Sequence, residues 1–129
     1  MRSINPERWP RPKGYNNGIV AEGRFLAVAG QIGWNERGEF VGDEFLAQAQ
    51  QALQNIVTIL KEAGGRPEHL VRLVWYVLDT IEYRAVSREL GAAYRAIVGD
   101  HYPAMTLVEV RALLEDRARV EIEATAVIP

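Results

Sequence analysis

The clearest pattern in the sequence is a long amphipathic segment from Phe45 to Ala63. Its apolar side chains recur every three or four residues, as they do on one face of an α-helix. They are Phe45, Ala49, Ala52, Leu53, Ile56, Ile59, Leu60 and Ala63. Asp43 precedes the segment as a typical N-cap, and Gly64 and Gly65 end it. A helix with one apolar face must pack that face against a second layer, so the chain is expected to fold in layers.

Strand patterns flank this helix on both sides. The segments Gly18–Glu22 and Phe25–Gly30 are separated by the tight turn Gly23-Arg24, which predicts a β-hairpin. Further runs rich in β-branched and aromatic residues predict the strands Val71–Leu78, Met105–Val110 and Arg119–Val127.

A second helix is predicted from about Ile81 to Val98, capped by Asp79 or Thr80, and the proline-rich lead-in Met1–Asn16 is predicted to be irregular. The order of elements is therefore β-β-α-β-α-β-β. Two long helices over one face of a single mixed β-sheet give a two-layer α+β sandwich. The length of 129 residues suits one domain that spans residues 1–129.

The second face of this sheet is also predicted to be apolar. Side chains alternate between the faces of a strand, and both sets in Val71–Leu78 are largely apolar. An exposed apolar face is unusual in a monomer, which favours burial against other copies of the chain. The alternative is that a loop of the same chain covers it.

Composition excludes several kinds of chemistry. The chain has no cysteine, which excludes disulfides, a thiolate nucleophile and cysteine-based metal sites. It has only two histidines and a net charge of −2, whereas nucleic-acid binders usually carry a basic excess. No apolar run approaches the roughly 20 residues of a membrane span. The sequence therefore predicts a cytoplasmic protein without a nucleic-acid or membrane partner.

Four segments, in this order and spacing, resemble the RidA (YjgF-like) family. They are GYNNGIVAEGRFLAVAGQIGWN, QAQQALQNIVTILKEAG, YPAMTLVEV and VEIEATAV, and the resemblance runs from about Lys13 to Val127. It implies a chorismate-mutase-like fold and a homotrimer with clefts between neighbouring subunits. It also implies hydrolysis of reactive enamines and imines to carbonyl compounds and ammonia, without a metal or organic cofactor.

The resemblance also assigns candidate site residues. The glutamate that orients the attacking water corresponds to Glu121. The residues that line the substrate cleft correspond to Tyr15, Ala29, Gly30, Gln31, Met105 and Leu107. Two of these depart from the family pattern: Met105 replaces the arginine that binds the substrate carboxylate, and Leu107 replaces a cysteine found in many members.

The missing arginine shapes the functional prediction. An arginine–carboxylate pair is bidentate and charge-assisted, whereas Met105 supplies only a flexible apolar surface. The sequence therefore predicts an imine or enamine deaminase whose substrate is not a simple 2-imino acid, unless another arginine reaches the cleft. The alternatives are a homotrimer that binds a small-molecule metabolite without converting it and, ranked lower, a ribonuclease or translation inhibitor.

Other residues carry weaker signals. Glu123 shares a strand face with Glu121, so either carboxylate is a candidate or both serve an interface. Trp34 and His101 lie in predicted loops, where they either border a cleft or serve packing. Arginines along the second helix are interrupted by glutamates, which favours a solvated face over a nucleic-acid site.

Overall fold

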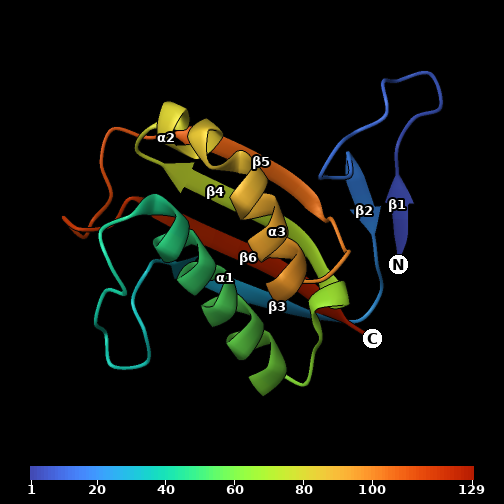
Figure 1. Cartoon of the computed structure of the whole chain (residues 1–129). Helices are drawn as coiled ribbons and strands as arrows, with labels where there is room; N and C mark the ends of the chain where they lie inside the picture. Colours follow the sequence, from blue (N-terminus) through green and yellow to red (C-terminus); the bar gives the residue numbers. More distant parts are fainter.

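The longest strands of the chain lie at the centre of a four-stranded sheet. The computed structural model describes residues 1–129 and places β3 (Arg24–Gln31), β6 (Val120–Ile128), β4 (Leu70–Val77) and β5 (Ala104–Glu109) in this order. β6 runs antiparallel to both neighbours, and β4 and β5 run parallel, so the sheet is mixed. The predicted α+β fold with a mixed sheet is confirmed (Figure 1).

The helices cover one face of this sheet, as the sequence predicts (Figure 1). α1 (Phe45–Glu62) buries its apolar stripe, and Leu53, Ile56 and Leu60 are almost fully inaccessible. Alternate residues of β4 and β6 face the helices and complete the core. The burial of these side chains supplies the main driving force for the layered arrangement. No helix in the structure combines the length and apolarity that crossing a membrane requires.

The predicted second helix is two helices. α2 (Thr80–Ala85) and α3 (Ser87–Ile97) meet at Val86, whose backbone leaves helical geometry (φ −116°, ψ 17°). The break serves two packing contacts, because Tyr83 in α2 packs edge-on against Phe45 while Leu90 in α3 is buried in the core. The helical segment therefore covers nearly the predicted range but is divided in two. Asp79 caps α2 as predicted, since its carboxylate accepts a hydrogen bond from the backbone N–H of Ile81.

The predicted N-terminal hairpin is wrong. β2 (Gly18–Val20) pairs with β1 (Arg2–Ile4), a strand within the lead-in that was predicted to be irregular. β3 instead pairs with β6. The fold therefore has a second, two-stranded sheet, which Figure 1 shows beside the main one. Hydrogen bonds that Asn5 donates to Asn16 and accepts from Asn17 close the loop between β1 and β2, an interaction that strand patterns do not reveal.

Another correction concerns the start of α1. Asp43 is not its N-cap; Glu44 holds that position and makes no side-chain cap hydrogen bond. The Asp43 carboxylate instead accepts hydrogen bonds from the guanidinium of Arg117, at 2.8 and 3.1 Å. The ion pair with Arg117 competes with the capping role that the sequence suggests.

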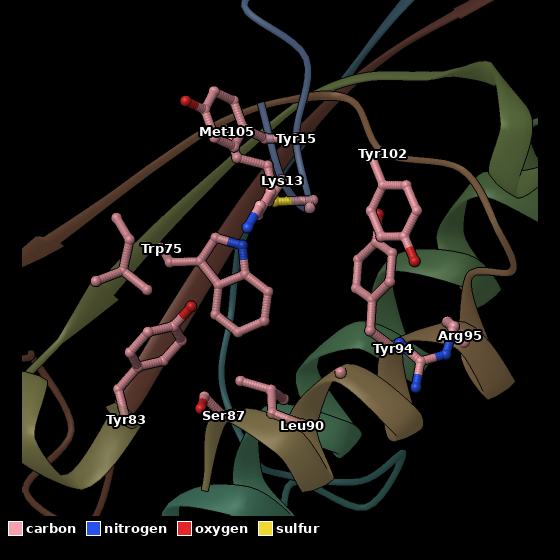
Figure 2. Close-up of a pocket in the computed structure, with 13 residues that line it drawn as sticks. Lys13, Tyr15, Trp75, Tyr83, Ser87, Leu90, Tyr94, Arg95, Tyr102 and Met105 are labelled. Atoms are coloured by element: carbon pink, nitrogen blue, oxygen red, sulfur yellow. The ribbon is translucent and has the colours of Figure 1, made fainter. Parts of the chain in front are cut away.

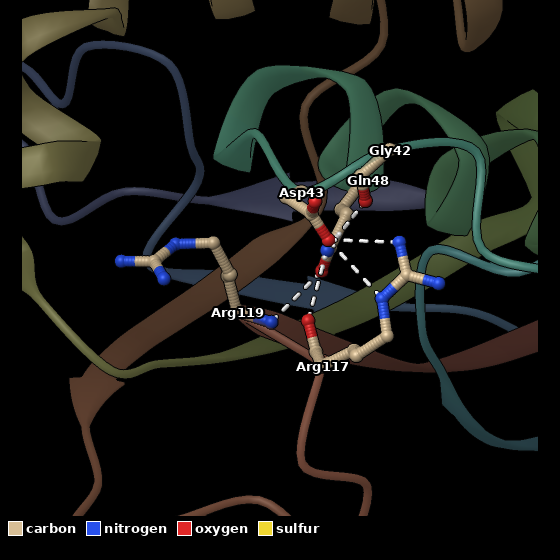
Figure 3. Close-up of polar contacts among 5 residues, drawn as sticks. All are labelled: Gly42, Asp43, Gln48, Arg117 and Arg119. Atoms are coloured by element: carbon tan, nitrogen blue, oxygen red, sulfur yellow. Dashed lines mark hydrogen bonds and ion pairs between the residues drawn. The ribbon is translucent and has the colours of Figure 1, made fainter.

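A buried glutamine fastens the start of α1 to the start of β6 (Figure 3). The Gln48 side chain is fully buried, and its amide donates hydrogen bonds to the carbonyl oxygens of Gly42 (2.9 Å) and Arg117 (3.0 Å). Its Oε1 accepts a hydrogen bond of 2.8 Å from the backbone N–H of Arg119. Both N–H groups of this amide and one lone pair of its oxygen are thereby used, which makes a buried polar side chain compatible with the core. Gly33 makes room for it, since a Cβ there would lie 2.5 Å from Gln48 Cβ.

The other face of the sheet carries no helix (Figure 1). Alternation places Arg72, Val74 and Tyr76 of β4 on it, beside Glu121 and Glu123 of β6. This face is therefore less apolar than the β4 sequence alone predicts.

Candidate functional site

A cavity of about 530 Å³ lies between α3, the strands β4 and β5, and the N-terminal arm, which we define as residues 1–17 (Figure 2). Most of its lining is aromatic or aliphatic. The lining residues are Lys13, Gly14, Tyr15, Trp75, Tyr83, Ser87, Leu90, Gly91, Tyr94, Arg95, Tyr102, Met105 and Leu107. A concave apolar site of this volume, with few polar groups, is typical of small-molecule binding sites.

The strands supply the floor of the cavity through their register. Trp75 of β4 lies opposite Leu107 of β5, and Leu73 lies opposite Met105, so these side chains point to the helical side of the sheet. α3 approaches from above with Leu90 and Tyr94. Because β5 is the edge strand of the sheet, the cavity lies at this edge.

Two stacked tyrosines form one wall. The rings of Tyr94 and Tyr102 are nearly parallel, with centroids 5.4 Å apart. The Tyr94 hydroxyl donates a hydrogen bond of 2.6 Å to the carbonyl oxygen of His101. Burial raises the pKa of Tyr94 well above its ordinary value, with a smaller contribution from Tyr102. Tyr94 is therefore a neutral, fixed wall whose hydroxyl proton is already engaged.

The N-terminal arm closes the cavity at its other end. The backbone N–H of Asn16 donates to the carbonyl oxygen of Pro103 (3.1 Å), and its side-chain amide donates to that of Tyr102. These bonds hold Lys13 and Tyr15 over the cavity, with the Lys13 amine directed toward Trp75 (Figure 2). The arm therefore contributes one of the two cationic side chains in the lining, and α3 contributes the other, Arg95.

A second group of candidate residues lies on the sheet face that carries no helix. Ala29 and Gly30 form a β-bulge of β3 opposite β6. The Glu121 carboxylate occupies the space that Gly30 leaves, because a Cβ there would lie 2.1 Å from Glu121 Oε2. None of the side-chain hydrogen bonds or ion pairs of the chain involves this carboxylate.

Glu123, the neighbouring candidate, has a partner. The Tyr76 hydroxyl donates a hydrogen bond to its carboxylate. This hydrogen bond is the main reason that the pKa of Tyr76 is raised. The two carboxylates on this face therefore differ: Glu123 is engaged within the chain, and Glu121 is free to act on a water or a ligand.

The structure brings together only part of the predicted site. Tyr15, Met105 and Leu107 line the cavity. Glu121 and Leu107 point to opposite faces of the sheet, since Tyr76 lies opposite Glu121 and its neighbour Trp75 lies opposite Leu107. Within one chain the carboxylate therefore does not reach the cavity.

Gln31 lies apart from both groups. It lines a groove along α1, together with Trp34 and Lys61, and its side-chain amide donates to the carbonyl oxygen of Ala29. Trp34 packs against Phe40 within its loop. The His101 ring nitrogen contacts the carbonyl oxygen of Leu70 at 2.7 Å, so His101 serves to fix the loop before β5.

Several lining residues escaped the sequence analysis. Trp75 and Tyr94 lie within the predicted strand Val71–Leu78 and the predicted helix Ile81–Val98, and nothing in their spacing separates a core position from a cavity wall. Lys13 was not singled out because its place depends on the docking of the arm. A signal did exist for Lys13, since it is one of only two lysines in the chain, the other being Lys61.

Comparison with known proteins adds the family. Residues 8–128 match the family described as Endoribonuclease L-PSP. The crystal structure of YyfB, a protein of unknown function of the Rid family from Yersinia pestis, superposes with a TM-score of 0.84 and 37% identity over 98% of each chain. The 2-iminobutanoate/2-iminopropanoate deaminase of Escherichia coli is 33% identical over 108 residues, which are 81% of this chain and 80% of that enzyme.

One solved relative contains a ligand. The crystal structure of Escherichia coli TdcF with bound serine superposes with a TM-score of 0.72 and 26% identity, over the full length of both chains. A small amino acid is thus bound by a protein with this fold. The extent of these matches, over nearly the whole chain, shows that the protein belongs to the Endoribonuclease L-PSP family, which includes RidA and the other Rid proteins.

Proposed function

We propose that the protein hydrolyses a reactive imine or enamine to a carbonyl compound and ammonia. The observation that carries the proposal is the Glu121 carboxylate, which lies in the space left by Gly30 and has no partner in the chain. The relationship to the Escherichia coli deaminase supports it.

The reaction needs little more than an oriented water molecule. Water adds to the carbon of the protonated imine: a C–O bond forms, the C=N π electrons move to nitrogen, and Glu121 accepts the proton that the water loses. An enamine first takes up a proton at carbon, which gives the same protonated imine. The resulting carbinolamine then breaks its C–N bond: the nitrogen takes up a proton and leaves as ammonia, and the oxygen gives up its proton to form the carbonyl group. The sum is one water consumed and one ammonia released, so no oxidant or metal is required.

The active site is proposed to lie between two copies of the chain in a homotrimer. The cavity residues and Glu121 belong to opposite faces of the sheet, so a single chain does not bring them together. The face that carries Glu121 has no helix over it, and the edge strand β5 lines the cavity. A neighbour that packs its open face against this edge brings its own Glu121 to the cavity.

The first test is imine hydrolysis by Glu121→Gln. An amino-acid oxidase generates imines in the assay, and their decay is timed with and without the protein. Loss of a general base is expected to lower the enzymatic rate by about 100-fold or more. The matched control is Glu123→Gln, on the same strand face, which is expected to keep most of the activity. Unchanged turnover in Glu121→Gln contradicts the assigned role; ligand binding without turnover in the wild type favours a non-catalytic binding protein.

The shared site has its own test. Leu107→Trp fills the cavity, and Glu121→Gln removes the base, so each variant alone is expected to be inactive. Oligomers assembled from both variants contain sites with an intact cavity from one chain and an intact Glu121 from its neighbour. Recovery of activity in the mixture supports the proposal. A monomer by light scattering, or mixed oligomers without activity, contradicts it.

RNA is not favoured as the substrate, although the family description names an endoribonuclease. The chain has a net charge of −2, and its cavity lining holds only two cationic side chains. Phosphate contacts by lysine and arginine supply most of the affinity of proteins for nucleic acids.

A further inference from the structure

We infer that the cavity selects a 2-imino acid with an aromatic side chain, whose carboxylate is bound by Lys13. This inference rests on the proposed function, because it names the substrate of the same site. It reverses one expectation from the sequence, in which the absence of an arginine at Met105 disfavours a carboxylate.

The cation at this end of the cavity comes from the arm. Lys13 and Met105 both line the cavity, and in the view of Figure 2 the Lys13 amine lies on the same side of it as the Met105 side chain. An ammonium group there can bind a carboxylate, for which the side chain of Met105 offers no positive charge. Lysine binds an anion as a flexible point charge rather than through a bidentate fork, so it needs less exact placement than arginine.

Arg95, the other cation of the lining, lies on the opposite side. Figure 2 places its guanidinium beside Tyr94, across the cavity from Lys13 and Met105. The chain's second lysine, Lys61, lines the groove along α1 and not this cavity. Among the cations that line this cavity, Lys13 is therefore the one on the side of Met105. Arg72 borders Met105 only in a separate, smaller pocket, because its side chain points to the other face of the sheet.

The remaining lining suits an aromatic ring. Trp75, Tyr83, Tyr94 and Tyr102 surround the space below Lys13, with Leu90 at its base (Figure 2). Aromatic rings that meet edge to face or in offset stacks attract each other beyond the effect of burial. A volume of about 530 Å³ also exceeds what an imino acid as small as 2-iminopropanoate fills, so most of this surface stays unused with such a ligand. A ligand with a carboxylate at one end and a ring at the other uses both parts of the lining.

The test measures binding, so that it does not depend on turnover. The probes are phenylpyruvate, which is the keto-acid product expected from an aromatic imino acid, its neutral amide, and pyruvate. Calorimetry with the wild-type oligomer is expected to show phenylpyruvate binding at least about tenfold more tightly than pyruvate. Lys13→Met is expected to weaken phenylpyruvate binding by about tenfold or more and to leave binding of the amide unchanged.

Three further variants complete the design. Lys61→Met, the matched control, is expected to bind like the wild type, and Lys13→Arg is expected to retain most of the affinity. Equal affinities for pyruvate and phenylpyruvate, an unchanged Lys13→Met, or a loss confined to Arg95→Met overturns the inference. Each of these results leaves the Glu121 assay untouched, so failure of this inference is distinguishable from failure of the proposed function.

Discussion

Two glycines at the end of β3, Gly30 and Gly33, each leave room for a polar side chain closer than any Cβ permits. At Gly33 the neighbour is Gln48, fully buried and hydrogen-bonded to three backbone groups. At Gly30 it is Glu121, whose carboxylate has no partner in the chain. A glycine that makes room for a polar side chain thus stabilises the fold in one region and leaves a carboxylate without a partner in the other. What separates structural from functional polar groups here is whether the chain itself satisfies them.

The largest expected effect is a loss of stability when the buried Gln48 amide is removed. Gln48→Leu leaves the carbonyl oxygens of Gly42 and Arg117 and the N–H of Arg119 without partners in a partly buried region. We expect the free energy of unfolding to fall by about 3 to 5 kcal/mol, since each such group costs about 1–3 kcal/mol. Thermal and urea unfolding measure this loss.

Asp43→Asn is the matched control for that variant. Asp43 also joins the start of α1 to the segment before β6, through Arg117, but both side chains are largely exposed. An exposed ion pair contributes at most about 1 kcal/mol, so the variant is expected to unfold almost like the wild type. A similar loss of stability in the two variants would show that the buried amide has no special part in the fold.

The next expected effect contrasts the glycines directly. In Gly33→Ala the new Cβ lies 2.7 Å from the backbone Cα of Gln48, which cannot easily move, so we expect a loss of about 1–3 kcal/mol in stability. In Gly30→Ala the Cβ meets the flexible end of Glu121. That side chain can rotate away, so we expect unfolding close to wild type and imine hydrolysis at least about tenfold slower. Melting curves and initial rates are measured on both variants. A destabilised Gly30→Ala and a stable Gly33→Ala would contradict the distinction between the two glycines.

The smallest expected effect tests the cavity wall through its pH dependence. Burial raises the pKa of Tyr94 in the folded state above the ordinary value of 10.0 that applies to the unfolded chain. The unfolded chain therefore releases this proton first, so the stabilising contribution is complete below pH 10 and declines as the pH rises above it. We expect the wild type to lose stability there more steeply than Tyr94→Phe, by up to about 1.4 kcal/mol per pH unit.

At neutral pH the wild type is expected to be the more stable of the two proteins. Tyr94→Phe lacks the hydrogen bond to the His101 carbonyl oxygen, so it is expected to be less stable by about 1 kcal/mol. Urea unfolding between pH 7 and pH 11 measures the gap between the two proteins. A gap that stays constant above pH 10 means that Tyr94 ionises as easily in the folded chain as in the unfolded one.

Local sequence patterns predicted the elements that are defined by helical periodicity or by β-propensity. The periodicity of Phe45–Ala63 gave α1 almost to the residue, and β-propensity located β4, β5 and β6. The pairing of β2 was wrong because it depends on asparagine side chains far along the lead-in. The sequence did not predict the break at Val86, because the break accompanies the packing of Tyr83 against Phe45 and no helix-breaking residue marks it.

The candidate site was predictable only in part for the same reason. Resemblance located Glu121 and Met105, yet nothing in the sequence says that Glu121 and Leu107 face opposite sides of the sheet until the register of β4 is known. Lys13 belongs to the cavity because Asn16 anchors the arm on the loop before β5. That contact joins residues far apart in the sequence, and no period or propensity encodes it.

The anchoring of the arm has a consequence for how the protein responds to a ligand. A molecule that contacts both Lys13 and the cavity floor binds only while the arm is attached through Asn16. By thermodynamic linkage, the free energy that the attached arm adds to ligand binding equals the free energy by which the bound ligand stabilises the attached arm. Occupancy of the cavity is therefore expected to be reported by slower proteolysis and slower amide exchange at residues 5–17, at a distance from the core.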